Sequence, residues 1–251
     1  MPKPVDDMFS AVEREAIKNY PNESCGLVLE TAGGKSLTVA CENISDRPRE
    51  NFVLNPLDYA KAMDLGKVVG VWHTHVELPS RASDPDKTGC ERSGLPWYIF
   101  SIRKQGDEFK FEGPTSISPS GFEIDYIGRP YVVGILDCYA LVQDYYKREY
   151  GIELGSYPVI DEKGIRSHTL FDSKYKEQGF ANIDIESDDK QKGDIFLMQI
   201  SDRQSNHIGI YLGDGIFMHH QHGRLSRKDV YGGMWQKHTT RWLRHKTFIK
   251  A

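Results

Sequence analysis

The sequence of 251 residues has few cysteines and no long hydrophobic run. Its four cysteines, Cys25, Cys41, Cys90 and Cys138, lie far apart and form no CxxC pair, which argues against a disulfide framework and a zinc knuckle. No stretch of 18 apolar residues occurs, so a transmembrane helix is excluded. The first 20 residues carry two early acids and lack the apolar core of a secretory signal. We therefore expect the chain to be made in the cytoplasm, without stable membrane insertion.

An excess of charge of one sign is also missing. The sequence has 32 Lys and Arg against 36 Asp and Glu, and neither half has the basic surplus of a dedicated nucleic-acid binder. Residues 221–251 are the exception, because they contain eight Lys or Arg and a single acid, Asp229. Such a segment is either a solvated terminal face or a patch for an anionic polymer such as a cell wall.

One break in composition divides the chain into two predicted domains. Residues 113–122, GPTSISPSGF, combine Gly, Pro and Ser with little apolar content, as linkers do. We therefore predict an N-terminal domain over residues 1–115 and a C-terminal domain over residues 116–251.

The two domains are predicted to differ in architecture. Helical spacing of apolar residues opens the first domain, and apolar runs separated by turns follow it, which predicts a mixed α/β fold. Its second helix is expected at residues 56–64. Its strands are expected at residues 24–30, 36–43, 68–76, 97–102 and 109–113. The second domain opens with a buried helix, DCYALVQDYYKREY. Short strands at residues 194–200, 207–213 and 215–220 follow, which predicts an α+β fold with an antiparallel sheet.

A dense group of polar residues lies in the sequence HTHVELPSRASDPD. His73 and His75 alternate on a predicted strand, so both imidazoles point to one face of the sheet. Asp86, at a predicted helix start, can turn back as a third ligand, and Asp84 is the alternative. Two histidines, a carboxylate and an open position suit catalytic Zn²⁺ with a bound water, for which Glu23 is the candidate general base. Two satisfied histidines beside a helix-capping acid are the structural alternative.

The spacing H-x-H, seven residues and S-x-x-D, with PNESCG upstream, resembles the motif of the JAMM metalloproteases. The resemblance covers roughly residues 8–113. It implies a deaminase-like α/β sandwich that cleaves isopeptide or peptide bonds. The roles that it implies are zinc ligands for His73, His75 and Asp86, acid/base for Glu23, and oxyanion binding for Ser83.

A second group of candidate catalytic residues lies in the C-terminal half. Cys138 follows Asp137 at a predicted helix start, where the positive end of the helix dipole favours a thiolate. A cysteine nucleophile needs a histidine as proton acceptor and a third polar group to orient that histidine. His207 and His219 lie on predicted strands joined by the turn GDG, and antiparallel pairing brings them close. A buried structural thiol is the alternative for Cys138.

The segments RPYVVGILDCYALVQDYY, KGDIFLM and NHIGIYLGDGIFMHH are similar to those of the NlpC-type cysteine peptidases. These are papain-like enzymes that cut peptidoglycan stem peptides, usually at γ-D-glutamyl–diamino acid bonds. The similarity covers about residues 120–235. It implies that Cys138 is the nucleophile, His207 the general base and His219 the orienting residue. It also implies that Tyr131 assists at the oxyanion site.

A JAMM-type domain followed by an NlpC-type domain resembles the tail assembly protein K family of lambda-like phages. The resemblance implies a bifunctional tail-tip hydrolase that acts in tail assembly or in local opening of the host wall. Its implied partners are peptidoglycan peptides and phage tail-tip proteins, with synthesis in the host cytoplasm and a place at the virion tail tip. Two alternatives stay open. One is an assembly factor or structural adaptor whose catalytic sites are idle, and the other is an enzyme that removes a ubiquitin-like tag.

Overall fold

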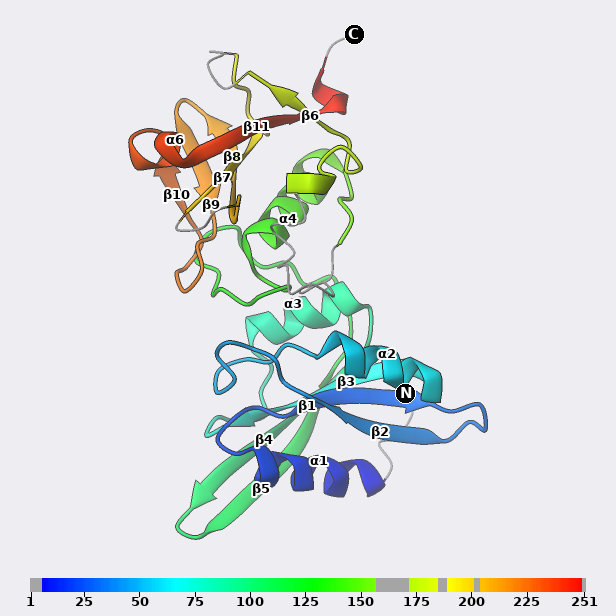
Figure 1. Ribbon diagram of the computed structural model, residues 1–251. Coiled ribbons are helices and arrows are strands. Elements are labelled where there is room, and N and C mark those ends of the chain that lie inside the picture. The colour runs from blue at the N-terminus through cyan, green and yellow to red at the C-terminus, as the bar shows by residue number, and fades with distance from the viewer. Residues whose placement is uncertain (1–5, 157–171, 185–188, 201–203, 250–251) are drawn as a thin grey trace. The chain divides into compact units, whose positions relative to one another are not determined.

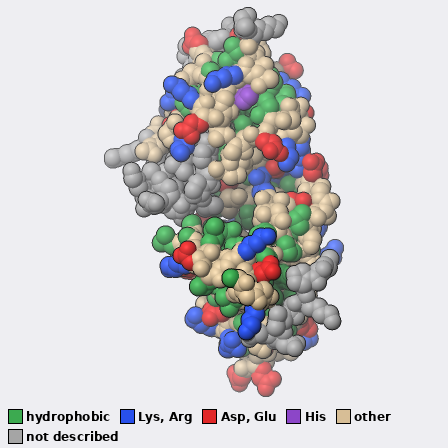
Figure 2. Space-filling model, turned by 90° about the vertical axis from the view of Figure 1, so that its right-hand side faces the viewer, with side chains coloured by type: hydrophobic (Ala, Val, Ile, Leu, Met, Phe, Trp, Pro, Cys, Tyr) green, Lys and Arg blue, Asp and Glu red, His purple; other side chains and the backbone are tan. Residues whose placement is uncertain are grey.

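The chain divides into two compact units. The computed structural model describes residues 6–156, 172–184, 189–200 and 204–249. One unit spans Met1–Glu123 and the other Ile124–Ala251, so the division falls after residue 123 rather than after residue 115. Figure 1 shows the helices and strands of both units. On the face drawn in Figure 2, acidic and basic side chains are interspersed, in keeping with the near balance of charge in the sequence.

The first unit is built on a five-stranded sheet with the order β2-β1-β3-β4-β5. Its strands are β1 (Cys25–Glu30), β2 (Ser36–Cys41), β3 (Lys67–Val76), β4 (Trp97–Gln105) and β5 (Glu108–Ile117). Strands β3 and β4 run parallel, and the other neighbours run antiparallel. Its helices are α1 (Asp6–Asn19), α2 (Pro56–Leu65) and α3 (Asp84–Ser93). The predicted mixed α/β architecture is confirmed.

The sheet carries different helices on its two faces. Met8 and Val12 of α1 pack against Trp72 of β3 in one apolar cluster. Side chains alternate along a strand, so the neighbour of Trp72, His73, points to the opposite face. Helix α3 covers that face, and its residue Asp86 contacts His73. Helices α1 and α3 accordingly lie on opposite sides of the sheet in Figure 1.

The linker predicted over residues 113–122 begins too early, because β5 continues to Ile117. Ile117 still pairs with Trp97 of β4, and the register of the two strands shifts beside Gly113. Gly113 has a φ of 118°, which favours glycine, and the irregularity lets the strand continue past it. The Gly and Pro that indicated a linker therefore belong in part to an irregular strand.

The second unit packs one helix against a sheet with the order β10-β9-β8-β7-β11-β6. The helix is α4 (Cys138–Tyr150), and all paired strands run antiparallel. The strands are β6 (Phe180–Ile183), β7 (Ile195–Met198), β8 (His207–Gly213), β9 (Ile216–His219), β10 (Arg227–Val230) and β11 (Thr239–His245). The predicted α+β architecture is confirmed, although β6, β10 and β11 were not predicted from the sequence.

The sheet of the second unit buries apolar side chains on both faces. Leu141 and Tyr145 of α4 pack against Ile210 of β8 on one face. On the other face, Trp242 of β11 packs with Trp235 of the short helix α6 (Met234–His238). A 3-10 turn, η1 (Lys246–Phe248), follows β11. The apolar spacing along the predicted helix thus marks the side that faces the sheet.

Two further points concern residues 151–190 and the search for a membrane-spanning helix. Residues 151–190, between the predicted helix and the predicted strands of the second domain, lie partly outside the described residues, and β6 occupies one described part of them. Within the described ranges, no helix has the length and apolar character needed to span a bilayer.

Two candidate active sites

The first candidate site lies between β3 and α3. His73 Nε2 lies 3.1 Å from Asp86 Oδ1, and His75 Nε2 lies 3.2 Å from Asp86 Oδ2. The other ring nitrogen of His75, Nδ1, lies 2.9 Å from the carbonyl oxygen of Pro79, which orients the ring. All three side chains are buried, and one ligand atom from each lies within 4.8 Å of the others. The structure therefore brings together the three residues expected to bind metal.

The start of α3 fixes the position of the carboxylate. Ser83 is the N-cap, and its Oγ accepts a hydrogen bond from the backbone N of Asp86 at 3.2 Å. The same Oγ donates to Asp86 Oδ2 at 2.6 Å, and the Ser83 backbone N donates to that oxygen at 2.7 Å. This capping box turns Asp86 back toward the histidines. Ser83 thus orients a candidate ligand, a contact that sequence reasoning missed, while its oxyanion role stays a prediction.

The environment of His73 fits a metal ligand. Its ring is stacked on Phe52, with 4.7 Å between ring centroids. Neither ring nitrogen makes a well-directed hydrogen bond within the described residues, although Nε2 lies close to Asp86. Burial lowers the pKa of His73, so the ring is neutral. Burial acts against the charge of Asp86, but the contacts with His73 and His75 outweigh it and hold the pKa of the carboxyl well below its usual range. Burial also acts against a charge on His75, but its contacts with Asp86 raise its pKa overall. A neutral imidazole such as that of His73, beside a carboxylate, is a donor that Zn²⁺ accepts.

Glu23 lies beside the histidines because of the register between β1 and β3. Cys25 of β1 is opposite His73, so the antiparallel register continued by two residues places Glu23 opposite His75. Glu23 is buried, and burial raises its pKa to about 8. The nearby His75 opposes this shift, and Asp86 adds to it. A carboxyl group that titrates near neutral pH suits proton transfer, and its role as general base stays a prediction.

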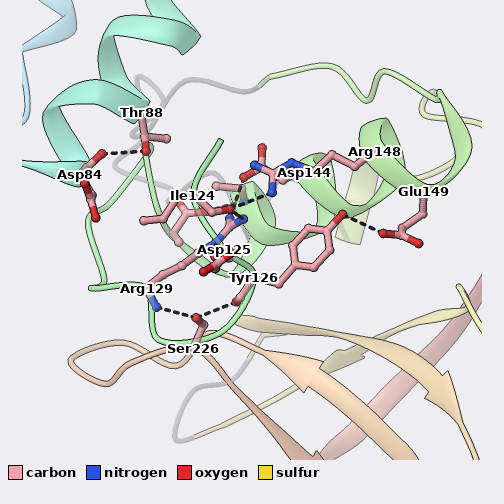
Figure 3. Close-up of polar contacts among 12 residues, drawn as sticks. Asp84, Thr88, Ile124, Asp125, Tyr126, Arg129, Asp144, Arg148, Glu149 and Ser226 are labelled. Carbon is pink, nitrogen blue, oxygen red and sulfur yellow. Dashed lines mark hydrogen bonds and ion pairs between the residues drawn. The ribbon is translucent and has the colours of Figure 1, made fainter. Parts of the chain in front are cut away.

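Asp84, the alternative ligand, is exposed and has other partners. Its carboxylate forms an ion pair with Lys87 at 2.9 Å. Its backbone carbonyl accepts a hydrogen bond from Thr88 Oγ1 at 2.8 Å, as Figure 3 shows. Asp84 does not belong to the His73 cluster of possible ligands in the described structure. The geometry therefore favours Asp86 as the third ligand.

The second candidate site begins at the N-terminus of α4. Asp137 is the N-cap, and its Oδ1 accepts a hydrogen bond from the backbone N of Ala140 at 2.8 Å. Its Oδ2 accepts one from the backbone N of Gly134 at 2.8 Å, which ties the preceding loop to the cap. Cys138 is therefore held as the first helical residue, and it is buried.

The burial of Cys138 offsets the effect expected from the helix start. Burial raises the pKa of the thiol well above its ordinary value, and Asp137 adds to this shift. Backbone groups of Ile208 and of the first turn of α4 lower the pKa by less. The start of α4 does favour the thiolate, as expected, but the loss of solvation outweighs this effect and leaves the pKa of the thiol raised. Cys138 therefore needs a neighbouring base to lose its proton.

Two histidines and one acid form a line across neighbouring strands. His207 begins β8 and His219 ends β9, and the pairing of these strands places Gly209 opposite His219. His207 Nε2 lies 2.8 Å from His219 Nδ1. His219 Nε2 lies 3.1 Å from Oδ2 of Asp229 on β10, which also forms an ion pair with Arg227. The structure thus brings His207 and His219 together and adds Asp229, which sequence reasoning missed.

The thiol lies near the start of β8, where a backbone hydrogen bond from Ile208 lowers the pKa of Cys138. Cys138 belongs to the same apolar cluster as Ile208, the residue after His207. Because Nε2 of His207 faces His219, Nδ1 is the nitrogen that can accept the proton of Cys138.

Tyr131 contacts other histidines. Its ring stands edge-on to the rings of His220 and His222, with 5.0 Å between centroids in both cases. His220 is buried, burial lowers its pKa to about 4, and its Nε2 lies 3.1 Å from the carbonyl oxygen of Arg224. His219, not His220, is therefore the partner of His207, and the oxyanion role of Tyr131 stays a prediction.

A buried arginine fixes the chain that leads into this site. Arg129 Nη1 forms an ion pair with Asp144 of α4 at 2.6 Å, and Arg129 Nε donates to the carbonyl oxygen of Asp125. The Arg129 backbone N donates to Ser226 Oγ, which in turn donates to the carbonyl oxygen of Tyr126 at 2.8 Å. Figure 3 shows these contacts around one loop. They tie α4 to the segment between β9 and β10.

Two family models match separate parts of the chain. The model of prokaryotic homologs of the JAB domain matches residues 5–112, and the model of the NlpC/P60 family matches residues 128–244. A solved NlpC/P60 family protein from Bacillus cereus aligns with 92% of this chain and 66% of its own, at 13% identity and a TM-score of 0.35. The chain is a two-domain protein with an N-terminal JAB-type domain and a C-terminal NlpC/P60 domain.

Two relatives match most of the length. Tail tip assembly protein K of Escherichia phage N15 is 35% identical over 240 residues, which is 95% of this chain and 94% of the relative. Tail tip assembly protein K of Escherichia phage lambda is 27% identical over 78% of this chain and 90% of its own. The chain belongs to the tail tip assembly protein K family. The resemblance expected from its motifs is confirmed.

Proposed function

We propose that the second unit is a cysteine peptidase that cuts peptidoglycan stem peptides. The observation that carries the proposal is the 2.8 Å contact between His207 Nε2 and His219 Nδ1, where the residue after His207, Ile208, makes a backbone hydrogen bond to Cys138. A hydrogen-bonded histidine pair beside a cysteine at a helix start suits nucleophilic catalysis. Membership of the NlpC/P60 family supports the same class of reaction.

The proposed reaction uses groups of this unit throughout. His207 accepts the proton of Cys138, and Sγ attacks the carbonyl carbon of the scissile amide while Tyr131 assists at the developing oxyanion. His207 then gives the proton to the leaving amine, and the C–N bond breaks to leave a thioester. Water attacks the thioester with His207 as its base, which releases the acid and restores the thiol. His219 holds the His207 ring throughout.

We propose that the first unit is a Zn²⁺-dependent peptidase or isopeptidase. Nε2 of His73, Nε2 of His75 and the carboxylate of Asp86 would hold the ion, and their burial and mutual distances support this. When bound, Zn²⁺ supplies a Lewis acid and lowers the pKa of a coordinated water. Glu23 accepts and returns the proton at its carboxyl. A hydroxyl has one hydrogen to donate, so Ser83 assists at the oxyanion only when its Oγ releases Asp86 Oδ2, which the Ser83 backbone N continues to hold.

We infer that phage tail-tip proteins are partners of the chain. The relatives from phages N15 and lambda are named tail tip assembly proteins, which supports synthesis in the host cytoplasm and a place at the virion tail tip. The same names favour a second function, that of an assembly factor or structural adaptor whose catalytic sites are idle. Peptidase activity separates the two.

Muropeptides from a diaminopimelate-type wall provide the test. The parent protein is expected to release new peptide ends, identified by mass spectrometry, and Cys138→Ala to release none. Cys41→Ala, which removes another buried thiol, is the matched control and should act like the parent. A folded parent that leaves every muropeptide intact would contradict the peptidase proposal and favour the assembly factor.

A further inference from the structure

Asp229 contacts His219 and was not among the residues expected in the cysteine site, which were Cys138, His207, His219 and Tyr131. We propose that Asp229 is a positioning residue, which fixes the hydrogen of His219 on Nε2 and thereby keeps His207 Nδ1 available as the base for Cys138. The proposal rests on the proposed cysteine peptidase function, because it concerns the protonation pattern that this reaction requires.

The first step concerns the hydrogen on His219. A neutral imidazole has one N–H donor and one acceptor nitrogen, whereas an ionised carboxylate only accepts. His219 Nε2 lies 3.1 Å from Asp229 Oδ2, so Nε2 carries the hydrogen. Burial lowers the pKa of His219, although Asp229 opposes that shift, so the ring remains neutral near pH 7. Nδ1 of His219 is then an acceptor.

The second step carries this pattern to the catalytic base. His219 Nδ1 lies 2.8 Å from His207 Nε2, so an acceptor on His219 requires a donor on His207. Neutral His207 then has its hydrogen on Nε2 and a lone pair on Nδ1, as the proposed proton transfer from Cys138 requires. The opposite tautomer of His219 would donate to His207 Nε2. The hydrogen of His207 would then lie on Nδ1, and a protonated Nδ1 cannot accept the proton of Cys138.

The aromatic neighbours of His219 fix the plane of its ring, whereas Asp229 selects its tautomer. The His219 ring is held by aromatic neighbours, with ring centroids 4.7 Å from Trp235 and 4.8 Å from Phe217. Packing of this kind fixes the plane of an imidazole but does not choose which nitrogen carries the hydrogen. Arg227 Nη2 lies 2.7 Å from Asp229 Oδ2 and holds the carboxylate in place. The charged acceptor therefore selects the tautomer.

The test compares Asp229→Asn with Asp214→Asn in the full chain. Asp214 lies in the turn between β8 and β9 and is exposed. An asparagine amide can donate as well as accept, so it no longer selects one tautomer of His219. ¹⁵N NMR of labelled histidines should place the hydrogen of His219 on Nε2 in the parent and in D214N. In D229N, we expect a substantial population with the hydrogen on Nδ1.

Two rates accompany the spectra, namely alkylation of Cys138 by iodoacetamide and cleavage of muropeptides. We expect both to fall at least about 10-fold in D229N and in Asp229→Ala, as when a general base loses its orienting group, with little change in D214N. Asp229→Glu keeps a carboxylate and should restore most of both rates. Asp229 is partly exposed on an edge strand, so the variants are expected to fold.

The outcomes separate this proposal from the peptidase proposal. Unchanged histidine tautomers in D229N overturn the role of Asp229, whatever the parent cleaves. Shifted tautomers with unchanged alkylation of Cys138 overturn it as well. Shifted tautomers and slower alkylation support it even if the parent leaves muropeptides intact, in which case only the proposed substrate fails.

Discussion

The two candidate sites are organised in opposite ways. In the first unit, two histidines converge on the single carboxylate of Asp86, within about 3 Å on each side. In the second unit, His207, His219 and Asp229 stand in a row, and each contacts the next. A convergent site is lost when its central residue is removed. In a linear site, the loss caused by removing a residue becomes smaller as the residue lies farther from the thiol. Four predictions on the two units run from the largest expected effect to the smallest, and the first and the last of them test this difference.

Loss of the central carboxylate should empty the first site. Asp86→Asn removes one ligand charge and the acceptor that both histidines face, so bound zinc should fall from about one ion per chain to a small fraction of that. Asp84→Asn is the matched control, because Asp84 is an exposed acid of the same helix and should retain the metal. Elemental analysis after dialysis measures both. His73→Ala should behave like D86N, and equal zinc in either variant and the parent would contradict the convergent site.

The same difference explains what could be predicted from the sequence. The candidate metal ligands lie within 14 residues, from His73 to Asp86, so strand alternation and one helix start were enough to group them. Even Glu23, far away in sequence, was indicated by its place just before a strand. The contact of Ser83 with Asp86 could also have been anticipated, because S-x-x-D at a helix start is a capping pattern.

The cysteine site was harder to predict because four separate elements supply it. Strand β10 was not predicted, since RKDV has almost no apolar alternation. Without a predicted strand there, Asp229 could not be placed beside His219. The one available signal was that Asp229 is the single acid in a basic segment. The high pKa of the Cys138 thiol depends on how deeply tertiary packing buries it, which helix position alone cannot give.

The second prediction concerns the buried tie between α4 and the segment after β9. Arg129→Met leaves Asp144 without its buried partner and should destabilise the second unit by about 3–5 kcal/mol. Arg148→Met removes a less buried arginine of the same cluster and should cost about 1 kcal/mol or less. Calorimetry or urea unfolding measures both. A similar loss in the two variants would show that the ion pair does not fix this site.

The third prediction concerns the acid sensitivity of the second unit. Burial lowers the pKa of His220 from 6.5 to about 4 in the folded chain, so the unfolded chain binds more protons between these values. Above pH 6.5, His220 is neutral in both states and does not make the free energy of unfolding depend on pH. As the pH falls from 6.5 toward 4, its protonation in the unfolded chain lowers the free energy of unfolding by as much as about 3 kcal/mol. His220→Gln should flatten the dependence of urea unfolding on pH in this window. The exposed His222, changed to Gln, should leave the dependence as in the parent.

The smallest effect is expected at the cap of α3. Ser83→Ala removes the hydroxyl that donates to Asp86 Oδ2 but keeps the backbone donor, so helix capping should weaken by about 1 kcal/mol. Loss of an orienting contact to a ligand should lower zinc affinity by about 10-fold rather than abolish binding. Ser36→Ala, at an exposed position of β2, is the control, and competition with a chelator gives the affinities. If S83A lost zinc as completely as D86N, the site would depend on its cap as much as on its centre, and the first unit would be no more convergent than the second.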